Sequence, residues 1–238
     1  MQPTLRRVAL PLTTVLLLIG SGPSVLRAAE AEPADGIALA IVYDTSGSMR
    51  DAVETADGSR AAKYIIANRA LAQIVTRIEQ FATNTASPRT VHGGLYIFRG
   101  TDVHEAVPMG PFDAGKFRDW LKSYRGPNSG TPLGTAVDVA SRAVLNSKLS
   151  QKHVLVVTDG RNTAGPDPEA VIPRVQKGAE RRKTTVFVHF VAFDIEAKVF
   201  APLKKMGVNV VGAVDEKQLN QQLGFILEEK ILLEKETK

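Results

Sequence analysis

Short apolar runs alternate with longer amphipathic stretches along the chain after residue 36. The short runs predict β-strands, and the stretches with apolar residues at helical spacing predict helices. We expect strands at 37–43, 95–98, 103–107, 153–158, 185–193 and 208–211. We expect helices at 61–81, 134–149, 168–182 and 196–206, two further helices beginning at Asp113 and Asp215, and a loop at 50–60.

This alternation predicts an α/β fold that is doubly wound and Rossmann-like, with a mostly parallel central sheet and helices on both faces. Residues 103–107 follow a tight turn and are expected to form one short antiparallel edge strand. The length of 238 residues suits a single domain of this kind. We place the domain at 37–229, after a linker at 32–36 and before a charged helical tail at 230–238.

The first 31 residues have the pattern of a secretory signal peptide. Arg6 and Arg7 precede an apolar stretch at 8–19, and small residues suited to signal peptidase follow it. The stretch is short for a membrane span, which needs about 20 apolar residues. We therefore expect a signal peptide at 1–31 and a mature protein in the periplasm or secreted. An uncleaved anchor is the alternative, and it is the one way in which we expect the protein to meet a membrane.

Composition and charge exclude several classes of function. The chain has no cysteine, which excludes disulfides and thiolate chemistry. The formal charge is +5, but three basic residues and one acidic residue lie in the first 31, so the remainder carries only +3. The basic cluster of Lys177 and 181–183 is interpreted as the solvated end of a helix. Without a basic stripe interleaved with aromatics, we expect no nucleic-acid binding.

Oxygen-bearing side chains follow two of the predicted strands. Asp44, Ser46 and Ser48 form an Asp-x-Ser-x-Ser pattern directly after the strand 37–43, and Asp159 follows the strand 153–158. In open parallel sheets, ligands bind at the carboxyl ends of the strands. Thr131 lies in a turn-rich segment that is able to cover the same edge. Hydroxyl and carboxylate oxygens are the ligands of a hard divalent cation.

Each of these motifs also has a simpler interpretation. Ser and Asp commonly cap a helix start, so Asp44-x-Ser46-x-Ser48 alone is also an N-cap pattern. The sequence Thr-Asp-Gly around Asp159 alone is also an ordinary turn. It is the combination, in this order and after two apolar strands, that favours a metal site.

The combination resembles the von Willebrand factor type A (vWA) family, in an exported bacterial form, with a complete metal-ion-dependent adhesion site (MIDAS). The resemblance implies that Ser46 and Ser48 bind the cation directly, that Thr131 joins with conformational state, and that Asp44 and Asp159 act largely through water. It implies Mg²⁺, with Mn²⁺ and Ca²⁺ as alternatives, and a partner protein that supplies an Asp or Glu. It also implies that the helix after Asp215 moves with metal occupancy.

Other motifs weigh little against this interpretation. Residues 110–117 nearly match a P-loop, but Phe117 stands where Ser or Thr should hold magnesium. No Gly-x-Ser-x-Gly elbow is present. We therefore expect a binding module and not an enzyme. The alternative is a metal-dependent envelope hydrolase acting on phosphoryl or acyl groups through Asp44 or Asp159.

Three segments are expected to surround the metal site and to select the partner, namely 57–60, 127–130 and 161–167. Arg161 is a candidate for steering an acidic partner toward the site.

Overall fold

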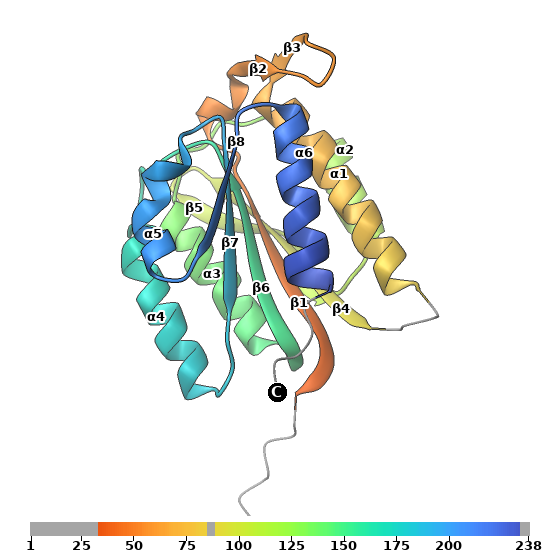
Figure 1. Cartoon of the computed structure of the whole chain (residues 1–238), viewed down its shortest axis with the longest axis vertical. Helices are drawn as coiled ribbons and strands as arrows, with labels where there is room; N and C mark the ends of the chain where they lie inside the picture. The colour runs from red at the N-terminus through yellow and green to blue at the C-terminus, as the bar shows by residue number, and fades with distance from the viewer. Residues whose placement is uncertain (1–32, 85–88, 234–238) are drawn as a thin grey trace, which may run out of the picture. The chain divides into compact units, whose positions relative to one another are not determined.

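The central sheet has six strands in the order β5-β4-β1-β6-β7-β8 (Figure 1). The computed structural model describes residues 33–84 and 89–233, so the expected signal peptide lies outside the described residues. The strand bounds are Ala34–Tyr43 (β1), Thr90–Arg99 (β4), Asp102–Pro111 (β5), Leu149–Thr158 (β6), Phe187–Phe193 (β7) and Asn209–Ala213 (β8). Only β4 and β5 pair antiparallel, and the other neighbours in this sheet are parallel. The expected α/β class is confirmed.

Helices cover both faces of this sheet. The helix bounds are Lys63–Ala82 (α1), Ala114–Ser123 (α2), Leu133–Asn146 (α3), Pro168–Arg181 (α4), Ala201–Lys205 (α5) and Glu216–Phe225 (α6). Alternate residues of β1 point to opposite faces, as the pleat of a strand requires. Leu39 and Ile41 pack in a core cluster with α1, α2 and α6, and Ala40 and Val42 pack in a second cluster with α3, α4 and α5.

The order of strands reverses beside β1. The chain passes from β1 to β4 on one side, and β6 later pairs with β1 on the other side. At such a switch point the loops that follow the two strands separate and leave a crevice at their carboxyl ends. Asp44 follows β1 and Asp159 follows β6, so both aspartates lie at this crevice.

Several elements differ from their predicted bounds. A hairpin of strands Ala52–Glu54 (β2) and Arg60–Ala62 (β3) replaces most of the loop expected at 50–60 and the first two residues of the helix expected at 61–81. The antiparallel edge strand β5 has ten residues instead of the expected short run. The helix expected at 196–206 begins as a 3-10 turn, Ala197–Phe200 (η2), before α5. These elements carry weak apolar periodicity, so their form depends on neighbours that the sequence pattern does not show.

The two predicted helix starts at aspartates are confirmed. Asp113 accepts a hydrogen bond from the backbone amide of Gly115 at 2.9 Å, and Asp215 accepts one from Gln218 at 2.7 Å. Both aspartates therefore cap the first turn of their helix, α2 and α6.

The chain stays helical beyond α6 because its apolar residues reach the core. The π-helical segment Ile226–Leu232 (η3) follows directly, and Ile231 and Leu232 are buried. These two residues belong to the packed core, although they lie in the segment expected to be a charged tail. Among the described residues, no helix is long and apolar enough to cross a membrane.

Candidate metal centre

Asp44 lies at the base of the crevice and is fully buried. Its Oδ1 accepts a hydrogen bond from the backbone amide of Ser46 at 2.7 Å, and its Oδ2 accepts one from the hydroxyl of Thr158 at 2.6 Å. Both oxygens are therefore held by the protein. These contacts fix the orientation of the carboxylate and of the turn that carries the two serines.

The two serines of the motif place their hydroxyls side by side. Ser46 Oγ lies 3.1 Å from Ser48 Oγ, and Ser48 donates a hydrogen bond to Asp159 Oδ1 at 2.8 Å. Ser46 is buried and Ser48 is exposed, so the site opens to solvent at Ser48. Ser46 stands at the N-cap position of the short 3-10 helix Gly47–Arg50 (η1) but makes no side-chain capping bond. The side chain of Ser46 therefore does not cap this helix, and its hydroxyl contacts Ser48 instead.

Thr131 reaches the same place from the loop before α3. A Cβ on Gly160 would lie 3.7 Å from Thr131 Oγ1 and 3.8 Å from Ser48 Oγ, so these two hydroxyls approach Gly160 together. The Thr131 backbone is held by Thr163, whose amide donates to Thr131 O at 2.9 Å and whose hydroxyl accepts from Thr131 N at 2.9 Å. The structure thus brings all five predicted site residues to one edge of the sheet.

Lys63 is a residue of this site that sequence reasoning missed. It is the first residue of α1, is only 4% exposed, and donates a hydrogen bond to Asp159 Oδ2 at 2.9 Å. Its ammonium also lies 3.0 Å from Asp194 Oδ2. Asp159 is thus engaged by side chains and does not merely form a turn. The only sequence signal for Lys63 is a charged residue directly after two small apolar ones, Ala61 and Ala62.

The charges of the site are tightly coupled. Burial, followed by the nearby charge of Asp159, raises the pKa of Asp44 to about 6, although hydrogen bonds from Ser46 and Thr158 partly oppose this. Burial alone would lower the pKa of Lys63, but its hydrogen bonds to the two carboxylates raise it above the ordinary value. Lys63 is shared between Asp159 and Asp194, so the crevice retains negative charge that a cation would neutralise.

The donor set fits a hard divalent cation. Adjacent ligands of an octahedral ion at about 2.1 Å are separated by about 3.0 Å, because that is the edge of the octahedron. The distance of 3.1 Å between the hydroxyls of Ser46 and Ser48 matches this edge. Across residues 33–84 and 89–233, no three His, Asp or Glu side chains are grouped to hold a metal ion.

A doubly wound α/β sheet, with hydroxyls between two strand-end aspartates at its switch point, defines the class of this domain. The sequence model of the von Willebrand factor type A domain matches residues 38–224. The chain therefore belongs to the vWA family. No curated protein matches the chain in a sequence search.

Several solved structures have a similar fold. The D319A mutant of the PilB minor pilin from Streptococcus sanguinis has a TM-score of 0.61 and 13% identity, over 85% of this chain and 63% of the pilin. The pilus adhesin SpaC from Lactobacillus rhamnosus GG has a TM-score of 0.59 and 12% identity, over 83% and 31%. The proximal thread matrix protein 1 of the mussel byssus, solved with a zinc-occupied MIDAS motif, has a TM-score of 0.55 and 15% identity, over 83% and 48%. At these identities the similarity shows the fold alone, and the chain spans less than two thirds of each of these proteins.

Proposed function

We propose that this protein binds a protein partner through a divalent cation at Asp44, Ser46, Ser48, Thr131 and Asp159. The observation that carries the proposal is the pair of hydroxyls 3.1 Å apart, which faces solvent at Ser48 and is backed by two buried carboxylates. Mg²⁺ is the proposed ion, with Mn²⁺ and Ca²⁺ as alternatives. Membership of the vWA family, a family of binding modules, supports this proposal. A pilus adhesin is among the solved structures similar to the chain.

Each residue has a distinct role in this proposal. Ser46 and Ser48 would ligate the ion directly, and Thr131 would complete the protein ligands. Asp44 and Asp159 already hold other groups and would act through water. A cation held mainly by neutral hydroxyls keeps most of its charge, so it attracts a carboxylate from outside. The partner would supply that Asp or Glu.

The contacts of the two aspartates argue against the hydrolase alternative. A nucleophile or general base needs a free oxygen within reach of the substrate. Asp44 is fully buried, and both of its oxygens accept hydrogen bonds. Asp159 is engaged by Ser48 on one oxygen and by Lys63 on the other. Binding is therefore the function that we propose.

A groove beside the site offers a second contact for the partner. Its volume is about 540 Å³, and Leu133 and Arg161 in its lining stand two residues after Thr131 and Asp159. An acidic partner segment that reaches the cation would lie close to Arg161. Because every vWA domain with such a site presents the same ion, flanking contacts of this kind would select the partner.

The hairpin of β2 and β3 is tied to α6, the helix that the family resemblance links to metal occupancy. Glu216 at the start of α6 accepts a hydrogen bond from the amide of Ala56 in the hairpin at 3.0 Å and pairs with Arg69 of α1 at 3.2 Å. We propose that a partner which contacts the hairpin would shift the position of α6, because the buried carboxylate of Glu216 links the two elements.

The location of the protein is also a proposal. The expected signal peptide at 1–31 would place the mature chain in the periplasm or outside the cell. The proposal rests on the pattern of Arg6, Arg7 and the apolar stretch at 8–19.

Calorimetric titration of Mg²⁺ and Mn²⁺ into the purified protein, followed by capture from envelope extract in Mg²⁺ or EDTA, tests the proposal. Thr131→Ala should weaken metal binding by at least about tenfold, because it removes one ligand oxygen. Thr184→Ala is the matched control, since Thr184 precedes β7 at the opposite end of the sheet. Partners should be retained only with Mg²⁺ and lost with Thr131→Ala. Retention that is equal in both buffers would refute the role of the ion.

A further inference from the structure

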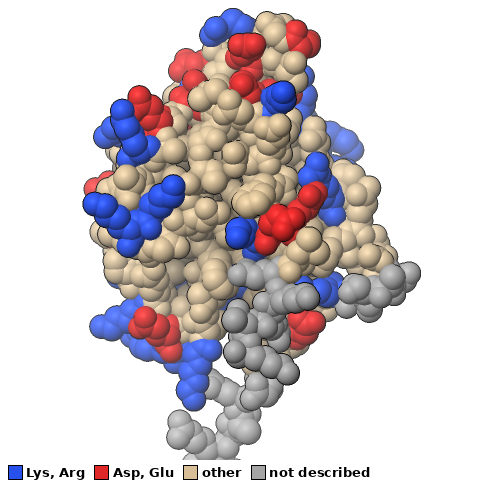
Figure 2. Space-filling view, viewed as in Figure 1, with Lys and Arg blue, Asp and Glu red and all other residues tan. Residues whose placement is uncertain are grey.

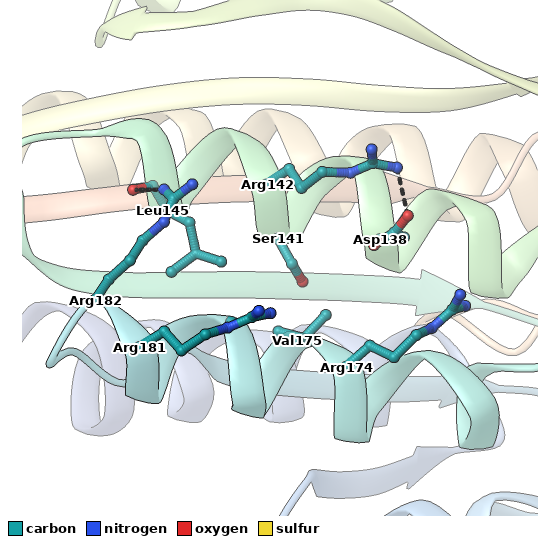
Figure 3. Close-up of a pocket in the computed structure, with 9 residues that line it drawn as sticks. Asp138, Ser141, Arg142, Leu145, Arg174, Val175, Arg181 and Arg182 are labelled. Carbon is teal, nitrogen blue, oxygen red and sulfur yellow. Dashed lines mark hydrogen bonds and ion pairs between the residues drawn. The ribbon is translucent and has the colours of Figure 1, made fainter.

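A groove lined by arginines lies between α3 and α4, on the face of the sheet that α3, α4 and α5 cover. The groove has a volume of about 300 Å³. Figure 3 shows four arginines around it, namely Arg142, Arg174, Arg181 and Arg182. Asp138 is the one acidic residue of the lining, so the lining carries a net charge of +3.

Two of these arginines are held in place by α3. Arg142 pairs with Asp138 one helical turn earlier. Arg182 donates hydrogen bonds to the backbone oxygen of Leu145 at 2.7 Å and to Asn146 Oδ1 at 3.0 Å. Arg182 therefore spans the end of α3 from α4, which fixes its guanidinium at one end of the groove.

The other two arginines, Arg174 and Arg181, have no acidic partner within the described parts of the chain. They lie seven residues apart on α4 and therefore share one face of that helix. Arg174 makes no hydrogen bond to a described residue, and Arg181 uses only its Nε, which donates to Lys177 O at 3.3 Å. Their Nη groups, which form the bidentate fork of a guanidinium, are free to bind a ligand.

The groove also contains an unpartnered buried hydroxyl. Ser141 of α3 is fully buried, and its Oγ has no hydrogen-bond partner among the described residues. Figure 3 shows this side chain directed from α3 toward α4. A buried polar atom without a partner is costly, and in a native protein it commonly marks a place where water or a ligand binds. This observation is independent of the arginines and points into the same groove.

The chemistry of the groove matches a phosphate group. Several guanidiniums and a hydroxyl donor suit a compact dianion with several acceptor oxygens, whereas a single carboxylate would be satisfied by one fork. We propose that the groove between α3 and α4 binds a phosphate group, carried either by a soluble phosphate compound or by a phospholipid headgroup.

The position of the groove is compatible with both sources. Its Arg182 end lies near the start of β1, because Ala34 N donates to Lys148 O at 3.0 Å just after α3. Figure 2 shows Lys and Arg side chains gathered over the lower end of α4 as drawn in Figure 1. The candidate metal centre lies at the opposite ends of the strands. The two sites are therefore separate, and phosphate binding should not depend on a divalent cation.

Two binding measurements in EDTA test the proposal and distinguish the sources. The first is calorimetric titration with pyrophosphate, and the second is flotation with phosphatidylglycerol vesicles against phosphatidylcholine vesicles, both at about 0.15 M salt to screen nonspecific attraction. Binding of pyrophosphate indicates a soluble phosphate compound. Binding to phosphatidylglycerol alone indicates a headgroup. Absence of both overturns the proposal.

Three variants distinguish specific phosphate binding in the groove from nonspecific electrostatic attraction to the positively charged protein. Arg174→Gln/Arg181→Gln should lower the affinity at least about tenfold. Lys116→Gln/Lys122→Gln removes the same charge from α2 on the other face and should change it less than about twofold. Ser141→Ala keeps the charge and removes only the hydroxyl, so it should lower the affinity about threefold or more without lowering the melting temperature. Equal losses in the two double variants, or wild-type affinity in Ser141→Ala, would contradict the assignment.

Discussion

Lys63 and Asp159 form an ion pair in which both side chains are buried, with exposures of 6% and 0% and an N–O distance of 2.9 Å. The ammonium therefore stands where it neutralises one carboxylate of the candidate metal centre from behind. Ser48 contacts the other oxygen of the same carboxylate from the solvent side. Asp159 is thus held between the ammonium of Lys63 and the hydroxyl of Ser48, which we propose as a ligand of the metal ion.

Lys63→Met should destabilise the metal-free protein by about 2–4 kcal/mol, because removing one member of a buried pair leaves the other charge uncompensated. Mg²⁺ should restore more stability in this variant than in the wild type, since the ion would then be the main positive charge near Asp159. Urea denaturation in EDTA and in Mg²⁺ measures both effects. Lys122→Met is the control, because Lys122 and its partner Asp119 are both 77% exposed. An equal Mg²⁺ effect in wild type and Lys63→Met would contradict this coupling.

Gly134→Ala should disturb the candidate site through the backbone. A Cβ at Gly134 would lie 2.0 Å from the carbonyl oxygen of Pro166, so the loop 161–167 must move. That loop holds Thr131 through Thr163. We expect a loss of about 1–3 kcal/mol of stability together with weaker Mn²⁺ binding, measured by denaturation and by electron paramagnetic resonance.

Gly178→Ala is the matched control for this change. Gly178 is also a helical glycine, but its Cβ would meet Leu145 at an ordinary 3.9 Å. We expect it to leave metal binding unchanged and to stabilise the protein by up to about 1 kcal/mol, the gain in helix propensity. If both variants behaved alike, the contact with Pro166 would not be the cause.

Glu216→Gln should loosen the link between the hairpin and α6. The substitution keeps the shape of a side chain that is 7% exposed but removes the charge that pairs with Arg69. We expect a loss of about 1–2 kcal/mol and faster amide hydrogen exchange at Ala56. Glu228→Gln, at an exposed pair with Arg77, should cause neither effect. Unchanged exchange at Ala56 would mean that Glu216 does not restrain the hairpin.

The buried histidine pair should make stability depend on pH. His153 Nδ1 lies 3.3 Å from His189 Nε2. Burial, followed by the charges of His189 and Arg89, lowers the pKa of His153 to about 3. Burial, followed by the charge of Lys230, lowers the pKa of His189 to about 4. Both imidazoles therefore stay neutral in the folded protein at pH values where an unfolded chain would protonate them.

The sign of the effect follows from proton uptake. Between about pH 6.5 and pH 4 the unfolded state binds more protons, so the free energy of unfolding falls by about 1 kcal/mol per pH unit for each histidine as the pH falls. Asp44 acts in the opposite direction over part of this range, because its folded pKa is raised to about 6. We therefore compare how steeply the free energy of unfolding changes with pH in the wild type and in each variant. His189→Gln should reduce the slope by about 1 kcal/mol per pH unit, whereas His104→Gln, at an exposed position, should not. Denaturant titrations from pH 4 to pH 7 measure this difference.

The alternation of apolar runs predicted the α/β class because each run had to be buried in a sheet covered on both faces. The same local pattern placed Asp44 and Asp159 at strand ends, and parallel pairing of β1 with β6 brings such ends together. It did not predict the hairpin at 52–62, since three-residue strands are too short to show a period. The basic cluster at the end of α4 is exposed, as the sequence predicted, but the sequence did not show that Arg181 and Arg182 line a groove shared with α3.

By itself, then, the sequence determined the alternation of the main strands and helices, the edge of the sheet where the oxygen-bearing side chains lie, and the helix starts at Asp113 and Asp215. These features depend on side-chain periodicity and on capping groups that lie next to each other in the chain. Only the tertiary structure decided that Lys63 neutralises Asp159, which lies 96 residues away, and that arginines of α4 face the buried hydroxyl of Ser141 in α3. Such contacts arise when whole elements pack, and no local pattern encodes which side chains of two distant segments will meet.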